Sequence, residues 1–296
     1  MSVGKSAAPS ALAVGLALAS VYLVWGSTYL AIRVGLDGGY PPFLMGSLRF
    51  VAASLVFYAF LRWRGHAPPT RAQWKNAAIM GLFMMLLGNG LVNVAEQTVS
   101  SGLAAVAVAS MPLWAGLFGM LRGQHPSRGE WTGLVIGFLG VVWLNFDGEM
   151  RASAVGMVAL LLAPIAWAWG SVWSRGRDLP APFMSTAAQM FCGGVAMGLL
   201  GLALGERIVE TPPLKATLAV GYLAAFGSII GFSAYVWLLH HVRPALATSY
   251  AYVNPPIAVL LGALLLHERV GWDAVGAMAV ILVGVVIITR AKARAA

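Results

Sequence analysis

Apolar runs of about twenty residues recur along this chain of 296 residues. An α-helix rises 1.5 Å per residue, so about twenty residues cross the roughly 30 Å hydrocarbon core of a bilayer. Inside lipid, every backbone N–H and C=O group must find its hydrogen-bond partner within the protein, and a single apolar run can do this only as a helix. The runs therefore predict an all-α integral membrane protein.

Ten runs qualify as spans, and each is bounded by charged or turn-forming residues. The composition agrees, because only 10% of the residues are charged, against about 25% in soluble proteins. The first run is too long for the apolar part of a signal peptide, so it is expected to be a span. The expected spans are residues 12–32, 43–61, 74–95, 101–121, 130–146, 154–174, 183–204, 215–239, 245–266 and 272–289.

Lysine and arginine are unequally divided between the two sides that ten spans would define. With the N-terminus inside, the inner segments hold thirteen of them and the outer segments five. Basic loops stay in the cytoplasm, so both termini are expected to be cytoplasmic, and the net charge of +9 reflects orientation rather than a nucleic-acid partner. The inner residues are Lys5, Arg62, Arg64, Arg71, Lys75, Arg122, Arg128, Arg175, Arg177, Arg243, Arg290, Lys292 and Arg294; the outer ones are Arg33, Arg151, Arg207, Lys215 and Arg269.

Glycines and prolines recur at one constant offset of 143 residues, which predicts two five-helix repeats at residues 1–149 and 150–296. Because each repeat has an odd number of spans, the second must insert upside down relative to the first. Inverted repeats are typical of secondary transporters, whose substrate site lies between the repeats near the bilayer midplane. The matched pairs are Gly88 and Gly231, Pro112 and Pro255, and Gly133 and Gly276.

The ninth run, from Pro244 to Glu268, contains Asn254-Pro255-Pro256 near its centre. Proline interrupts the helical hydrogen-bond ladder, and the carbonyls it frees are tolerated where they face protein or a polar cavity. We therefore expect a break at this point, with Pro112, Pro255 and Pro256 shaping a gate. A kinked packing helix without a ligand is the alternative.

Aromatic and polar residues at membrane depth are the candidates for a substrate site. Trp25-Gly26-Ser27 in the first span recurs as Trp169-Gly170-Ser171 in the sixth, which places two tryptophans in matching positions. Helix packing is the alternative for the aromatic residues, and a bond to their own backbone for the serines. The candidate substrate-binding residues are Trp25, Ser27, Asn89, Asn93, Ser110, Trp114, Trp169, Ser171, Tyr235, Tyr252 and Asn254.

Charged and catalytic groups are scarce at depth. Arg49 lies about two turns into the second span, where a charge is by default a candidate for a functional site. Snorkelling to the surface or pairing with Asp37 is the preferred interpretation. With these boundaries no Asp or Glu lies at mid-span, which favours uniport over coupling to protons. The chain has no nucleotide-binding or hydrolase motif, and its single cysteine, Cys192, excludes a cysteine-only zinc site, so no enzyme activity, metal or cofactor is expected.

Three stretches resemble a known family. They are WGSTYLAIR followed by PPFLMGSLRF, the segment ASMPLWAGL, and PALATSYAYVNPPIAVLLGALLLHERV. Together they resemble the EamA family of the drug/metabolite transporter superfamily, and within it the YddG-type exporters of amino acids from the bacterial inner membrane. The resemblance implies a ten-helix basket around a central cavity, worked by alternating access.

The expected function is therefore export of small amphipathic solutes, including aromatic amino acids, across the bacterial inner membrane. The partners are then the solute and the lipid bilayer, and the sequence is compatible with a monomer. Four alternatives stay open: a multidrug or cationic-metabolite exporter, a nucleotide-sugar carrier of the same superfamily, a membrane-embedded lipid-modifying enzyme, and a passive channel. A nucleotide-sugar carrier would need basic residues for phosphates, and the enzyme would need clustered polar residues near one interface.

The topology can be tested with single cysteines in a Cys192→Ala background. We expect a cysteine replacing Gly65 to react with an impermeant thiol reagent only from the cytoplasmic side, because the loop around it carries inner arginines. A cysteine replacing Gly148 should react only from outside. Labelling of both positions from the same side of oriented vesicles would contradict the ten-span topology.

Overall fold

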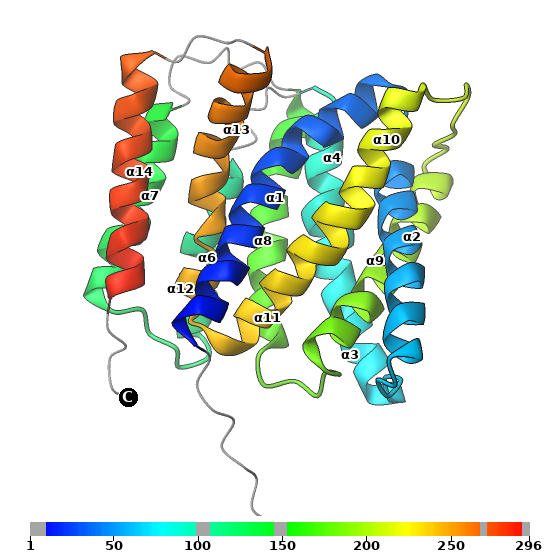
Figure 1. Cartoon of the computed structure of the whole chain (residues 1–296), viewed down its shortest axis with the longest axis horizontal. Coiled ribbons are helices and arrows are strands. Elements are labelled where there is room, and N and C mark those ends of the chain that lie inside the picture. Colours follow the sequence, from blue (N-terminus) through cyan, green and yellow to red (C-terminus); the bar gives the residue numbers. More distant parts are fainter. Residues whose placement is uncertain (1–9, 99–106, 145–152, 267–270, 292–296) are drawn as a thin grey trace, which may run out of the picture.

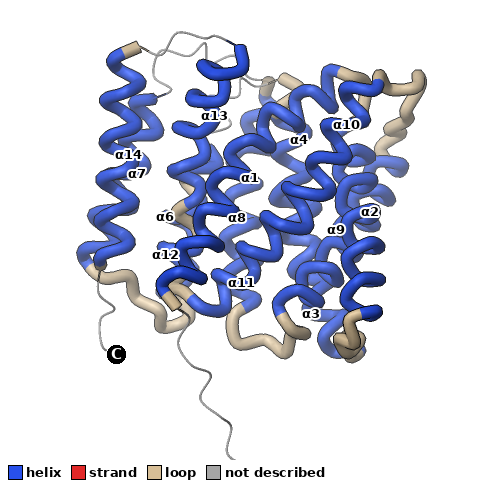
Figure 2. The backbone as a smooth tube through the Cα atoms, in the orientation of Figure 1, coloured by secondary structure: helices blue, strands red, loops and turns tan. Residues whose placement is uncertain are grey.

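The computed structural model describes residues 10–98, 107–144, 153–266 and 271–291. These residues form a bundle of helices and contain no strand (Figures 1 and 2). Several residues used in the sequence analysis lie outside the described ranges, namely Lys5, Gly148, Arg151, Glu268, Arg269, Lys292 and Arg294.

The helices follow one another with short connections. In the first half they are α1 (Ala11–Asp37), α2 (Pro42–Trp63), α3 (Arg71–Gly81), the π-helix η1 (Leu82–Gly90), α4 (Leu91–Ala95), α6 (Met111–Met120) and α7 (Arg128–Leu144). In the second half they are α8 (Ala154–Ser174), α9 (Pro182–Ala203), α10 (Leu214–Tyr222), the π-helix η2 (Leu223–Phe232), α11 (Ser233–His241), α12 (Pro244–Ala247), α13 (Tyr250–Leu266) and α14 (Trp272–Arg290).

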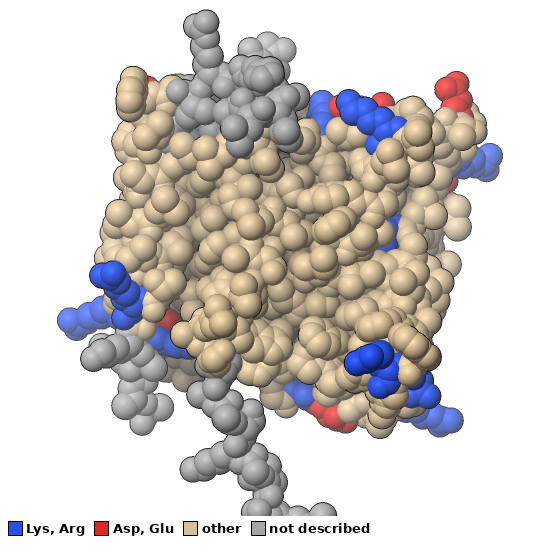
Figure 3. All heavy atoms as spheres, viewed as in Figure 1, with Lys and Arg blue, Asp and Glu red and all other residues tan. Residues whose placement is uncertain are grey.

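Helix length and hydropathy agree with a membrane protein. Six helical segments of the described chain are long and apolar enough to cross a bilayer, and two shorter apolar helices accompany them. Figure 3 shows that Lys, Arg, Asp and Glu gather almost entirely toward the two ends of the visible face, with a broad band lacking them in between. The six segments are Ala11–Asp37, Pro42–Trp63, Arg71–Ala95, Ala154–Ser174, Pro182–Ala203 and Leu214–His241.

Contacts between helices repeat themselves in the two halves. Helices α2 and α9 pack along each other, as do α7 and α14, and the partners in each pair run in opposite directions (Figure 1). Helix α1 contacts α10, η2, α11 and α13, and α8 makes the corresponding contacts with α3, η1, α4 and α6. Such reciprocal packing is the arrangement that an inverted repeat would produce, and it places α1 and α8 at the centre of the bundle.

Two long helices contain a π-helical segment in their middle, η1 between α3 and α4 and η2 between α10 and α11. Shifted by the repeat offset of 143 residues, η1 overlaps η2 over most of its length. In a π-helix the hydrogen bond spans one residue more than in an α-helix, and such segments are frequent at functional sites. The hydropathy pattern predicted both helices but carried no signal for this widening.

The expected break in the ninth span lies earlier than predicted. The non-helical turn is at Thr248-Ser249, between α12 and α13, and Pro255 and Pro256 lie inside α13. The prediction at Asn254-Pro255 was therefore displaced by about two helical turns. Buried neighbours hold α13 in helical form through its two prolines, because Val253 to Pro256 are all buried within the bundle. In a packed bundle, neighbouring helices and side chains can satisfy the backbone carbonyls that a proline leaves without a hydrogen bond.

Close approach of α7 and α14 depends on glycine. A methyl group added at Gly133 would lie 2.7 Å from the carbonyl oxygen of Gly284 and 2.9 Å from the backbone nitrogen of Ile288. Gly133→Ala should therefore push the helices apart and cost about 1–3 kcal/mol, measured as a lower melting temperature of the purified protein in detergent. Gly221→Ala on α10 is the control, since nothing lies within 4 Å of the added group. Equal melting of the two variants would contradict this packing.

Candidate functional site

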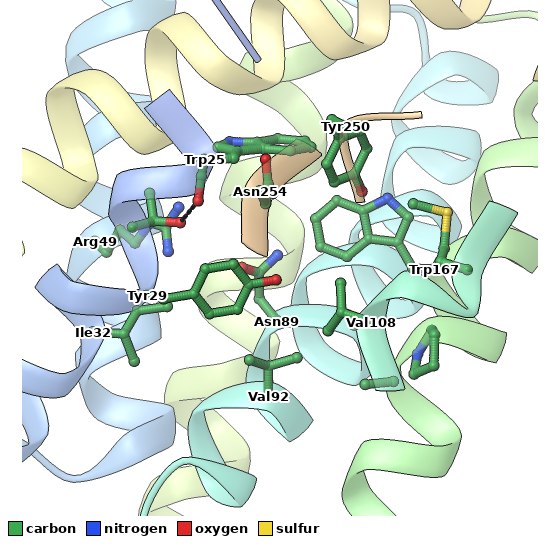
Figure 4. Close-up of a pocket in the computed structure, with 15 residues that line it drawn as sticks. Trp25, Tyr29, Ile32, Arg49, Asn89, Val92, Val108, Trp167, Tyr250 and Asn254 are labelled. Atoms are coloured by element: carbon green, nitrogen blue, oxygen red, sulfur yellow. Dashed lines mark hydrogen bonds between the residues drawn. The ribbon is translucent and has the colours of Figure 1, made fainter. Parts of the chain in front are cut away.

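A cavity lies between the two halves of the bundle (Figure 4). Its wall is formed by α1, α2, η1, α4, α6 with the helical residues that lead into it, and, from the second half, α8 and α13. The cavity has a volume of about 60 Å³, which is enough for a few water molecules. The lining residues are Trp25, Thr28, Tyr29, Ile32, Arg49, Gly88, Asn89, Val92, Val108, Met111, Ala163, Pro164, Trp167, Tyr250 and Asn254.

Aromatic rings close the cavity on one side. The ring of Trp25 lies 4.6 Å from that of Tyr250, 4.9 Å from Phe232, 5.2 Å from Tyr235 and 5.5 Å from Trp167, measured between centroids. Most of these pairs meet edge to face, a favoured geometry for aromatic side chains. The cluster belongs to the part of the bundle near α11 and α12, toward the end where α1 begins and α14 ends. We call that end the lower face (bottom of Figure 1).

Polar side chains connect the two halves at the lower face. Arg122, from the α6–α7 loop, donates to the carbonyl of Arg175 over 2.8 Å. Within the second half, Arg175 donates in turn to the carbonyl of Val242 over 2.6 Å. Arg243 forms an ion pair with Glu130, a carboxylate that is 3% exposed and also accepts from the backbone of its own helix start. These bonds and the aromatic cluster both separate the cavity from the lower face.

Two amides point into the cavity from opposite halves (Figure 4). Asn89 lies on η1 and donates to the carbonyl of Met84 over 3.2 Å, five residues earlier. Asn254 lies on α13, is 2% exposed, and its side-chain oxygen has no hydrogen-bond partner. A buried amide oxygen without a partner is costly, so it would gain from a ligand that donates a hydrogen bond. The sequence analysis selected both residues.

Arg49 also lines the cavity, which corrects its interpretation as a surface or loop-paired residue. It is 3% exposed, and its Nε donates to the hydroxyl of Ser228 over 2.9 Å. Asp37 pairs instead with Arg33, one turn before it on α1, at 3.2 Å. The cavity wall therefore carries a charge, although the candidate substrate-binding residues chosen from the sequence included no charged residue. Its hydrogen-bond partner Ser228 lies on η2, and nothing in the sequence indicated that η2 packs beside α2.

Trp169 does not line the cavity, although its position in the sequence repeat matches that of Trp25. Trp169 is 38% exposed and stacks edge to face on Phe118 at the outside of the bundle. Trp167, two residues earlier on α8, lines the cavity instead. Residues two apart on a helix point in directions about 200° apart, so a shift of two residues turns an inward side chain outward.

Other predicted residues surround the cavity wall without forming it. Ser171 and Tyr235 bond each other over 2.8 Å behind Trp167, and Tyr252 donates to the carbonyl of Leu134 over 2.9 Å. Asn93 donates to the carbonyl of Pro42 over 3.1 Å. The remaining ones also lie outside the lining: Ser27, bonded to Tyr222; Ser110, bonded to the carbonyl of Ala107; Trp114, stacked on Phe118; and the prolines Pro112, Pro255 and Pro256.

Sequence reasoning missed several lining residues. Thr28, Tyr29 and Ile32 follow Trp25 at helical spacing on α1, and that spacing from an accepted site residue was a usable signal. Tyr250, one turn before Asn254 on α13, also lines the cavity. For Pro164 on α8, the sequence offered no motif that would have indicated a place in the cavity wall. Within the described part of the chain no cluster of His, Cys, Asp or Glu has the makings of a metal site.

Comparisons with known proteins agree on a family. The family described as EamA-like transporters matches residues 12–146 and again residues 154–290. A protein of Escherichia coli (strain K12), named an uncharacterized inner membrane transporter, YedA, is 44% identical over 280 residues, which cover 93% of this chain and 90% of that protein. The uncharacterized transporter YdfC of Bacillus subtilis (strain 168) is 26% identical over 248 residues, 83% of this chain and 80% of that one.

A crystal structure of another protein shares the fold. It aligns with a TM-score of 0.80 at 22% sequence identity and covers 94% of this chain and 98% of that one. The double family match, the 44% identical relative and the apolar helical bundle all point the same way. The chain belongs to the EamA-like transporter family and is a membrane transporter.

Proposed function

We propose that this protein is a secondary transporter that moves small amphipathic solutes, most suitably amino acids including aromatic ones. The observation that carries the proposal is the cavity between the two halves, which combines aromatic rings with the amides of Asn89 and Asn254. Aromatic walls with a few placed polar groups suit small molecules that have an apolar and a polar part.

Alternating access fits the arrangement of contacts. The bundle is proposed to have ten spans, two inverted repeats at residues 1–149 and 150–296, and a pathway between them. The double family match and the reciprocal contacts of α1 and α8 support this division. The lower face is closed by the aromatic cluster and by the Arg243–Glu130 pair, so opening on that side would need those contacts to separate.

The proposed location is the bacterial inner membrane, with the lower face and both termini in the cytoplasm. The name of the relative YedA supports the membrane. The charge distribution supports the orientation, because among the described residues ten Lys and Arg lie at helix ends or loops of the lower face and three at the other face. The ten are Arg62, Arg64, Arg71, Lys75, Arg122, Arg128, Arg175, Arg177, Arg243 and Arg290; the three are Arg33, Arg207 and Lys215.

We propose that the protein is a uniporter, which moves its solute down the solute's own gradient without a coupled proton. The residues that line the cavity include no Asp, Glu or His, the side chains that commonly carry a coupled proton. If transport were coupled to protons, the first candidate for the proton site would be Glu96, at the end of α4 and outside that lining. Its side chain is 3% exposed, and one of its oxygens has no hydrogen-bond partner. Export then follows from a high cytoplasmic concentration of the solute.

The aromatic wall can be tested with two tryptophans of one helix. Trp167→Leu should weaken solute binding about two- to tenfold, because an aromatic contact contributes about 0.5–1.5 kcal/mol beyond its area. The measurement is counterflow of labelled amino acids in proteoliposomes. Trp169→Leu is the matched control, since that ring lies outside the cavity, and it should leave transport unchanged. Equal loss in both variants would contradict the assignment of this wall.

The energetics can be tested by a pH step of about two units across proteoliposomes with equal solute on both sides, since a coupled carboxylate would have to bind the proton. We expect no net accumulation. Accumulation that a protonophore abolishes would contradict uniport, and Glu96→Gln would then identify whether that carboxylate is the proton site.

A further inference from the structure

Arg49 is a buried cation in the cavity wall without an anionic partner. It lies on α2, about two turns from Pro42, and is 3% exposed. The ion pairs found within the described residues are Arg33–Asp37 and Arg243–Glu130, and neither involves Arg49. None of the fifteen residues that line the cavity is acidic. An arginine inside a membrane protein normally pairs with an acidic group or lines a functional site.

The surrounding wall is shaped to hold this guanidinium. A methyl group added at Gly227 on η2 would lie 2.9 Å from its Nη2 and 3.1 Å from the side chain of Thr28. Ser228 accepts from Nε and itself donates to the carbonyl of Leu223 over 3.0 Å. Glycine at 227 therefore makes room, and the next residue fixes the direction of the side chain.

Most of the hydrogen-bonding capacity of Arg49 remains unused. A guanidinium carries five N–H groups, and the bond to Ser228 uses one of them. No other hydrogen bond from Arg49 is found within the part of the chain that the structure describes. Its Cζ lies 4.7 Å from the ring centre of Phe50, its neighbour in sequence, but a ring face does not satisfy the remaining N–H groups. They are left for a ligand in the cavity.

We propose that Arg49 binds the carboxylate of the transported solute, so that the protein selects solutes with a carboxylate and rejects amines that lack one. The inference rests on the proposed transport function. The planar fork of arginine matches the two oxygens of a carboxylate, and the pair gains strength where water is excluded. Figure 4 shows Arg49 at one end of the cavity and Trp167 at the other. A solute with its carboxylate at Arg49 would place an apolar side chain toward the aromatic rings.

The first experiment needs no variant. Proteoliposomes with the wild-type protein are tested for uptake of labelled phenylalanine, 3-phenylpropionate, phenylalaninamide and 2-phenylethylamine, which share one ring and differ in carboxylate and amine. We expect phenylalanine or 3-phenylpropionate to be transported, and the amide and the amine to be poor substrates. The first two compounds distinguish a zwitterion from a simple acid. Transport of 2-phenylethylamine as fast as that of either carboxylate would overturn the proposal while leaving transport itself established. Transport of none of the four, with a wider amino-acid panel also negative, would instead refute the proposed function and the inference with it.

Variants then assign the selectivity to Arg49. Arg49→Gln should weaken binding of the carboxylate about 10- to 100-fold, the range for a lost hydrogen bond to a charged group, and should leave phenylalaninamide unchanged. Arg49→Lys keeps the positive charge but lacks the planar guanidinium, so this variant should fold even if a charge is needed at that position. Its affinity for the carboxylate should lie between those of Arg49→Gln and the wild-type protein. Arg33→Gln is the control, because it removes a cation from α1 outside the cavity. Unchanged carboxylate preference in folded Arg49→Gln or Arg49→Lys protein would overturn the proposal.

Discussion

The structure depends on the requirement that backbone hydrogen bonds be satisfied without water. In an apolar bundle each helix meets this requirement within itself, and the places where it does not do so are few. Two of them are the π-helical segments η1 and η2. Three side-chain bonds reach carbonyls there: Asn89 to Met84, Ser228 to Leu223, and Trp25 Nε1 to Gly227 over 2.9 Å. Two of these side chains, Asn89 and Trp25, line the cavity.

Close packing then fixes how the halves meet. Glycines let α7 approach α14 and let Gly81 on α3 approach the backbone of α9, where an added methyl group would lie 2.5 Å from the carbonyl of Gln189. An added methyl group finds no room in these interfaces. The lower face is different, because its connections are an ion pair, two arginine–carbonyl bonds and a ring cluster, all of which can separate and re-form. Alternating access, as proposed, would use both kinds of contact: close glycine contacts that hold a helix of one half against a helix of the other, and reversible contacts that let the pathway open.

The fold was largely predictable and the site only in part, for one physical reason. Hydropathy reports that a helix lies in the membrane, but a helix that is apolar on every side gives little indication of which face points inward. Trp25, Asn89 and Asn254 were candidates from the sequence and line the cavity. The two asparagines were chosen because an amide at mid-span rarely faces lipid. Trp169 was placed inward on the strength of a sequence repeat, and a two-residue phase difference between α1 and α8 reversed it. The π-helical turns could not be predicted because they follow from tertiary packing.

The role of Arg49 depends on which face of α2 carries it. Two turns from a helix start, an arginine can extend to the surface, and its energy there differs little from that of any exposed cation. The same residue turned inward loses its water, and the loss of hydration is of several kcal/mol unless an anion or several acceptors replace it. Here the inward position is fixed by Ser228 and by the space left at Gly227, while one hydroxyl is the single acceptor found among the described residues. A site that holds a cation in place without neutralising it is complementary to an anionic group on its ligand, and the aromatic rings at the far end of the cavity limit that group to one end of an otherwise apolar molecule.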